Sequence, residues 1–165
     1  MSTVPAAEPL EAVIGRMAAV ISSSTFPTGD RAALRRMVPA QPIPLTFYRF
    51  ALNYCPSNWQ YQRDDWLAIT AGIALMSPAA HDPRVGLGAA LARHGYSEAR
   101  LERLLGARGE VRRILFLRAV RFLAAKVQPF NWVEGARFLL TSDAEKREEL
   151  NFRIARDFYN YERKE

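Results

Sequence analysis

The chain has 165 residues and a mass of 18.7 kDa, the size of one ordinary domain or of two small helical lobes that share a core. Hydrophobic residues make up 49% and charged residues 24%, and 9 Gly and 10 Pro are scattered along the chain, which excludes disorder and collagen-like repeats. The formal net charge is +6, and 20 of the 23 basic residues are arginines, which favours a polyanionic partner.

Neither a membrane-spanning segment nor a secretion signal is indicated by the sequence. The longest nearly apolar stretch, residues 66–76, has about half of the roughly 20 residues that a bilayer-spanning helix needs. Residues 1–10 lack the basic start and the apolar middle of a signal peptide. We therefore expect a cytoplasmic protein without a membrane partner.

No constellation of residues predicts catalysis, a metal site or a cofactor. Cys55 is the single cysteine and has no basic sequence neighbour to lower its thiol pKa. His81 and His94 each lack a second His or Cys three or four residues away that would complete a zinc site. Asp64 and Asp65 are adjacent, but consecutive helical positions diverge by about 100°, so the two carboxylates face different surroundings. We expect a protein that is not an enzyme and holds no cofactor.

Apolar residues recur at helical spacing, and residues that start or end helices interrupt them repeatedly. Since no run of alternating β-branched residues occurs either, the sequence predicts an all-α fold. In chain order we expect helices at 10–21, 28–37, 45–54, 63–76, 84–93, 97–106, 110–127 and 131–138, and a terminal helix that a capping box at 142–145 opens and that runs to about residue 161.

The segment 78–83 predicts a linker between two small helical bundles, an N-terminal lobe at 1–77 and a C-terminal lobe at 84–165. Several aromatic side chains lie on the predicted helices, and we assign them to the core in preference to base stacking. They are Phe47, Tyr48, Trp59, Trp66 and Trp132.

The net positive charge is concentrated in one region. Residues 84–126 contain ten basic and three acidic residues, a net charge of +7 that exceeds the charge of the whole chain. Within it, Arg118 and Arg121 lie three positions apart, and their other neighbours at helical spacing are apolar, so two like charges repel without relief. A carboxylate elsewhere in the fold or a nucleic-acid phosphate would compensate them, and the surplus of charge favours phosphate.

Several short motifs occur in an order and spacing that resemble the CasB family, the small subunit of the type I-E CRISPR Cascade complex. The likeness covers about residues 8–160. The motifs are Leu34-Arg35-Arg36, Phe47-Tyr48-Arg49, Gly86-Leu87-Gly88-Ala89-Ala90-Leu91-Ala92, Ser97-Glu98-Ala99-Arg100-Leu101, Arg103-Leu104-Leu105, Leu117-Arg118 and Asn131-Trp132.

The resemblance implies a non-catalytic subunit of two helical bundles that pairs head to tail with a second copy of itself among other Cascade subunits. It also implies contacts with the guide RNA and target strand, and a basic groove that holds the displaced strand of the R-loop. The family's basic positions fall on Arg35, Arg36, Arg63, Arg100 and Arg118, to which we add Arg103 and Arg121 as neighbours in the groove. The chain departs from the family pattern at Ala89, where relatives often carry Arg.

Two other classes of protein stay open at this point. A helix-turn-helix regulator would read duplex DNA through a helix pair such as the one predicted at 84–105. A protein-only adaptor would instead use its arginines to bind acidic partners. Arg49 has a further possible role, as the partner in a structural ion pair.

Overall fold

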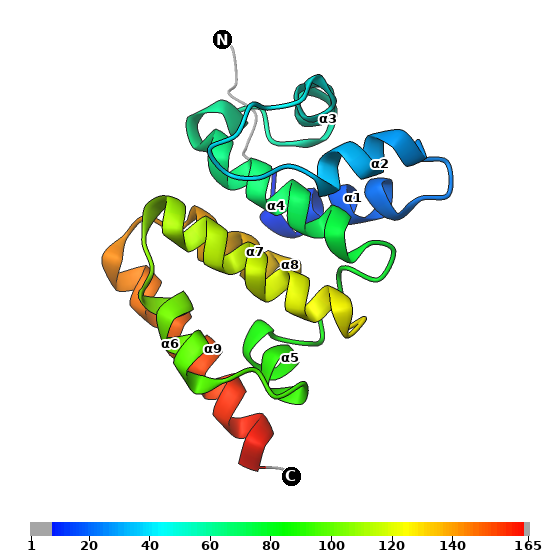
Figure 1. The fold of residues 1–165 in the computed structure, drawn as a ribbon. Helices are drawn as coiled ribbons and strands as arrows, with labels where there is room; N and C mark the ends of the chain where they lie inside the picture. Colours follow the sequence, from blue (N-terminus) through cyan, green and yellow to red (C-terminus); the bar gives the residue numbers. More distant parts are fainter. Residues whose placement is uncertain (1–7, 164–165) are drawn as a thin grey trace.

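A computed structural model describes residues 8–163 of the chain, and over these residues the fold is all-α, as predicted (Figure 1). No strand occurs in the described part. The elements are α1 (Leu10–Ser22), α2 (Thr28–Arg35), α3 (Leu45–Tyr54), the 3-10 turn η1 (Trp59–Gln62), α4 (Arg63–Met76), α5 (Leu87–Arg93), α6 (Glu98–Gly106), α7 (Gly109–Ala125), α8 (Trp132–Leu140) and α9 (Ala144–Arg163).

Side-chain caps fix the start of two helices where the sequence predicts them. The Ser97 hydroxyl accepts a hydrogen bond from the Arg100 N–H at 3.2 Å at the start of α6. The Asn131 carbonyl oxygen accepts one from the Val133 N–H at 3.0 Å at the start of α8. The bounds of α3 and α4 are also those predicted.

Two helix starts differ from the prediction by more than one residue, each for a local reason. The first is α5, which begins at Leu87 because Arg84 belongs to a turn in which its N–H donates to the Asp82 carboxylate at 3.0 Å. The second is α9, where Asp143 and not Ser142 is the capping residue, since the Asp143 carboxylate accepts from the Lys146 N–H at 3.0 Å. The predicted capping box is therefore wrong by one residue.

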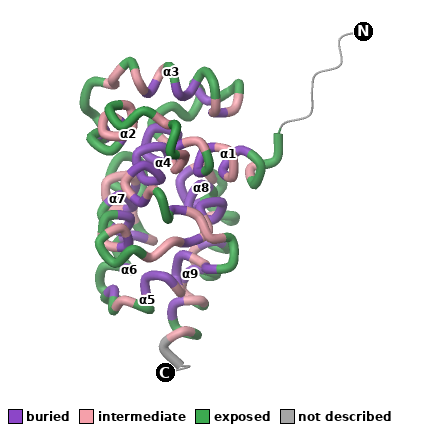
Figure 2. The backbone as a smooth tube through the Cα atoms, turned by 90° about the vertical axis from the view of Figure 1, so that its right-hand side faces the viewer, coloured by how far each residue is buried: buried purple, intermediate pink, exposed green. Residues whose placement is uncertain are grey.

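The core of the protein is built around α4, which is buried on nearly every side from Trp66 to Ala74. It packs against α7 and α8, and also against α1 and α2. Figure 1 shows α4 and α7 lying side by side, and in Figure 2 the buried stretches of α4 and α8 lie on the inside. Gly72 lets the Trp132 ring of α8 approach α4, because a side chain at this position would overlap that ring.

One hydrophobic cluster runs through the described residues from α1 to α9. Buried side chains on both sides of the segment 78–83 belong to it, so the predicted arrangement of two separate lobes is not confirmed. The boundaries at 1–77 and 84–165, whose ends include residues outside the described part, stay predictions. Phe47, Trp59, Trp66 and Trp132 are buried in this cluster, which confirms their assignment to the core, and Tyr48 packs against it half-buried.

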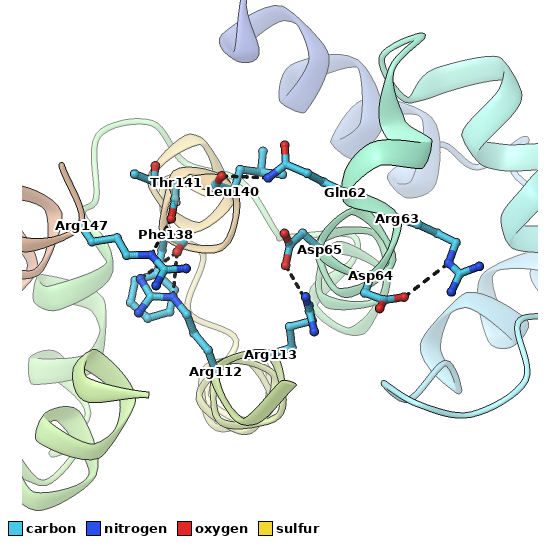
Figure 3. A network of polar contacts seen from close by, with 10 residues as sticks. All are labelled: Gln62, Arg63, Asp64, Asp65, Arg112, Arg113, Phe138, Leu140, Thr141 and Arg147. Carbon is cyan, nitrogen blue, oxygen red and sulfur yellow. Dashed lines mark hydrogen bonds and ion pairs between the residues drawn. The ribbon is translucent and has the colours of Figure 1, made fainter. Parts of the chain in front are cut away.

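Polar contacts also join α4 to the second half of the chain (Figure 3). The Asp65 carboxylate accepts a hydrogen bond from the Arg113 guanidinium of α7 at 2.8 Å in a half-buried ion pair. The exposed Asp64 pairs instead with Arg63, so the two adjacent carboxylates do face different surroundings, as predicted. The Gln62 amide donates to the Leu140 carbonyl oxygen at 2.9 Å.

The helices α5 and α9 approach each other closely at Gly88, where a side chain would overlap the backbone carbonyl oxygen of Ile154. A buried carboxylate helps to hold α5 in this position. Glu134 of α8 accepts a hydrogen bond from the Leu87 N–H, the first residue of α5, at 2.8 Å. Burial raises the pKa of Glu134 above its ordinary value.

No helix among residues 8–163 combines the length and the apolar composition that crossing a bilayer requires. The N-terminal segment, in which the sequence indicates no signal peptide, lies largely outside the described residues.

Replacing Gly88 with Ala is expected to lower the free energy of unfolding by about 1–3 kcal/mol, because the overlapped atom belongs to a backbone and cannot rotate away. Gly15 is the matched control, since it lies inside α1 with open space around it. Gly15→Ala should raise the same quantity by about 0.5–1 kcal/mol. Urea titration of both variants measures the difference, and a Gly88→Ala protein as stable as Gly15→Ala would contradict the close approach.

Replacing Glu134 with Gln removes the buried charge and keeps an acceptor for the Leu87 N–H. A raised folded-state pKa means that the contribution of the wild-type carboxyl to stability is present at low pH and is lost as the pH rises through that value. We therefore expect Glu134→Gln to be more stable than wild type at pH 7, by a margin that shrinks as the pH falls. Glu134→Ala, which leaves the N–H unpaired, should lose about 1–3 kcal/mol. Denaturant titrations across pH check both, and a margin that grows on acidification would contradict this assignment.

Candidate nucleic-acid interface

Four of the predicted site residues lie on two neighbouring helices, and we call Arg100, Arg103, Arg118 and Arg121 the α6–α7 arginines. Two of them, Arg118 and Arg121, are exposed on α7, a helix that packs on α4 and has Phe116 and Val120 among its buried residues. Within residues 8–163, the guanidinium groups of Arg118 and Arg121 take part in no ion pair or hydrogen bond. Their charges are therefore uncompensated by the fold.

The arginines of α6 reach the solvent because the other side of this helix is anchored in the core by Leu101 and Leu104. Arg100 lies over the ring of Tyr96 at 5.1 Å and over the ring of Phe122 of α7 at 5.7 Å. These cation–π contacts place its guanidinium beside α7 without cancelling its charge. Arg103 has no ion-pair partner in the described chain.

An open hollow of about 530 Å³ lies between α6 and the start of α7. Arg103 and Glu102 line it together with apolar groups, among them Val111, which is 57% exposed, and Leu115. The α6–α7 surface thus combines unpaired cations with a small apolar floor. Such a surface can contact the phosphates and the apolar parts of a flexible polyanion.

The two predicted site residues of α2 differ in their contacts. Arg35 is exposed, but its Nε donates to the Ala74 carbonyl oxygen at 2.8 Å and its Nη2 to the Ser77 hydroxyl at 3.0 Å. It therefore caps the C-terminal end of α4, where partial negative charge favours a cation. Arg36 is exposed without a side-chain partner in the described part and lines a hollow of about 240 Å³ beside Val38.

Arg63 lies at the other end of α4 and forms an exposed ion pair with Asp64 at 3.4 Å. Eleven residues, about 16 Å of helix rise, separate it from the Ala74 carbonyl that holds Arg35. Among residues 8–163, no hydrogen bond, ion pair or ring contact joins Arg35, Arg36 or Arg63 to the α6–α7 arginines. That all seven predicted site residues line one basic groove stays a prediction.

Several basic residues of the region 84–126 are held by the fold itself. Arg112 is buried, at 3% exposure, and donates to the Phe138 and Ala107 carbonyl oxygens. The others with partners are Arg84 with Asp82, Arg113 with Asp65 and Arg93 over the Tyr161 ring. The cations of this region without such a contact in the described part are Arg103, Arg108, Arg118, Arg121 and Lys126.

Lys126 and Arg108 are exposed cations at the two ends of α7 that our sequence-based site omits. The charge count over 84–126 includes both, so the regional surplus was the signal that could have identified them. In the first half of the chain, Arg49 forms the structural ion pair that the sequence left open, with Asp30 at 2.8 Å.

The single cysteine and the two histidines are each buried or hydrogen-bonded within the fold. Cys55 is buried, and burial raises the pKa of its thiol to about 12. The His81 Nδ1 accepts the Trp132 N–H at 3.0 Å, and His94 is hydrogen-bonded to the Gln128 side chain at 3.0 Å. The described residues contain no group of three His, Cys, Asp or Glu side chains arranged to hold a metal ion.

Comparison with known proteins identifies the family. A search of curated proteins finds no match to the chain. A family model described as CRISPR-associated protein Cse2 matches residues 30–159, which is about four-fifths of the sequence. The match confirms the resemblance to the small subunit of type I-E Cascade. The chain therefore belongs to the CRISPR-associated protein Cse2 family and is a CRISPR Cascade subunit.

Proposed function

We propose that this chain is the non-catalytic small subunit of a Cascade complex and binds nucleic acid by its phosphate backbone without reading base sequence. In this role it stabilises the R-loop of guide RNA and target DNA, together with the displaced strand, in antiviral defence. Its partners are other Cascade subunits, the nucleic-acid strands and a second copy of itself, in the cytoplasm. The observation that carries the proposal is the pair of exposed, uncompensated charges at Arg118 and Arg121.

The electrostatics of α7 support this proposal. Like charges at a spacing of three residues on a helix cost a few tenths of a kcal/mol, and no carboxylate among residues 8–163 pairs with either arginine to relieve this repulsion. A phosphate backbone relieves it and gains further free energy from the release of condensed counterions. The planar fork of each guanidinium can hold two phosphate oxygens at once.

The neighbouring arginines extend the same surface from α7 to α6. Arg100 is kept beside α7 by Phe122, and Arg103 lies at the rim of the hollow between the two helices. Contacts of this kind are made to the phosphates along a strand and do not depend on its bases. They can therefore hold a displaced strand of any sequence.

We expect the double variant Arg118→Ala/Arg121→Ala to bind single-stranded DNA more weakly for every sequence. Because two phosphate contacts are lost, the plot of log K against log salt concentration should become less steep by about 1.4. Fluorescence anisotropy over a series of salt concentrations measures the slope. Unchanged binding by the folded double variant, or a strong preference of wild type for one duplex sequence, would contradict the proposal.

Arg137→Ala is the matched control for this experiment. Arg137 is 45% exposed and pairs with Glu11 of α1 at 2.9 Å. In Figure 2, α1 and α8 lie to the right and α6 and α7 to the left, and the side of α8 that contacts α7 carries Phe138, whereas Arg137 is exposed. An exposed ion pair contributes little to stability, so this variant should fold and bind with the slope of wild type.

In the assembled complex, we expect Arg118→Ala/Arg121→Ala to co-purify with the other Cascade subunits and a guide RNA, yet to form a less persistent R-loop. The reason is that the altered residues hold the strand and are not core residues of the subunit. The lifetime of the target complex in a gel-shift chase measures this, with the Arg137→Ala complex beside it. An R-loop as persistent as that of wild type would contradict the assigned role.

A further inference from the structure

A second cluster of cations lines a hollow that adjoins the one beside Arg103, with which it shares Gly106 and Ala107. This hollow, of about 220 Å³, lies where the end of α6 and the start of α7 meet the start of α9. Arg108, Arg112 and Arg147 line it, with Glu148 as the one acidic residue of the lining. Three cations against one carboxylate give this small volume a formal charge of +2.

Arg112 supplies a buried charge that the fold solvates only with neutral groups. Its Nε and Nη2 donate to the Phe138 carbonyl oxygen at 2.9 and 2.8 Å, and its Nη1 donates to the Ala107 carbonyl oxygen at 3.1 Å. Its guanidinium carbon lies 3.6 Å from the centre of the Phe138 ring. Asp65, the carboxylate whose charge acts on Arg112, is already paired with Arg113. These contacts leave Arg112 without a direct anionic partner.

Arg147 adds a second positive charge beside the first. Figure 3 shows its guanidinium, which comes from α9, next to that of Arg112 from α7. The Arg147 Nε donates to the Thr141 carbonyl oxygen at 2.6 Å, another neutral acceptor. Burial, and then the like charge of Arg147, lower the pKa of Arg112 to about 10, so Arg112 keeps its charge at neutral pH. Neither cation forms an ion pair within residues 8–163, and Asp65, whose charge acts on both, is paired with Arg113, so a positive surplus that favours an anion remains.

The rest of the lining adds a cation and a hydroxyl donor, and the Asn151 side-chain oxygen, a buried acceptor without a hydrogen-bond partner among residues 8–163, opposes them. Arg108, at the start of α7, is exposed and has no side-chain partner in the described part of the chain. Two carbonyl oxygens at the end of α6, which would repel an anion, are engaged: Ala107 accepts from Arg112, and Leu105 accepts from the Asn151 amide at 3.1 Å. The Ser142 hydroxyl is a further donor at the wall.

We propose that this hollow is a phosphate-binding site in which Arg108 and Arg147 donate to the phosphate oxygens and Arg112 supplies the buried charge. A phosphate group fits the chemistry because the guanidinium fork matches its oxygens. The group can belong to a nucleic-acid backbone or be free inorganic phosphate. This site is separate from the α6–α7 arginines, so it does not depend on the proposed function.

The test measures binding of inorganic phosphate to the full chain by isothermal titration calorimetry, with chloride at equal ionic strength as the reference. Arg108→Gln removes a lining charge that has no role in folding, and it should weaken phosphate binding by about tenfold. Glu148→Gln removes the opposing carboxylate and should tighten it. Lys146→Gln is the matched control, because Lys146 precedes Arg147 on α9 but does not line the hollow.

The expected result is binding of phosphate but not of chloride, unchanged by Lys146→Gln and by Arg118→Ala. A wild-type chain that does not distinguish phosphate from chloride would overturn the proposal, as would equal binding by Arg108→Gln, Glu148→Gln and Lys146→Gln. A short single-stranded oligonucleotide then separates the two sources. If the oligonucleotide competes with inorganic phosphate for binding, the site belongs to a nucleic-acid backbone. If the oligonucleotide does not compete, the site belongs to free phosphate.

Discussion

The packing of α4 against α7 determines where the charges of this protein lie. Because α4 is buried on nearly every side, α7 must present an apolar side to it, with Phe116, Val120 and Leu123 buried. The position of each arginine on α7 therefore determines whether it contacts other residues of the fold or faces solvent. Arg112 donates to a buried carbonyl and Arg113 to the half-buried Asp65, whereas Arg118 and Arg121 face solvent. The same contact that builds the core therefore also builds the cationic surface.

The arginines fall into two physical groups with different consequences. Those engaged by carboxylates or carbonyls, such as Arg113 with Asp65 and Arg35 with Ala74, join helices and contribute to the fold. Those without partners, such as Arg118 and Arg121, contribute little to folding and repel each other. Arg112 stands between the groups, since its charge is buried and its partners are neutral. In this Cse2-family chain the second group is the one that an external polyanion can stabilise.

Local signals were sufficient to predict much of the fold. Apolar periodicity and punctuation predicted the all-α class and the bounds of α3 and α4, and side-chain caps fixed the starts of α6 and α8. The sequence could not show that Arg35 caps α4 through a carbonyl 39 residues away, or that Arg112 donates to one 26 residues away. Whether an arginine is a structural residue or a site residue depends on its tertiary contacts. The spacing of residues along the sequence does not reveal those contacts.

The most direct test of the account is a map of the residues that respond when a single strand binds. Backbone amide NMR of the labelled chain, titrated with a poly-dT oligonucleotide, reports every residue whose surroundings change. We expect the largest shifts on the outer sides of α6 and α7, near Arg103 and Arg118, with α1 and the exposed part of α8 unaffected. Shifts concentrated on α1 and α8, or no shifts at saturating oligonucleotide, would contradict the placement of the interface on α6 and α7.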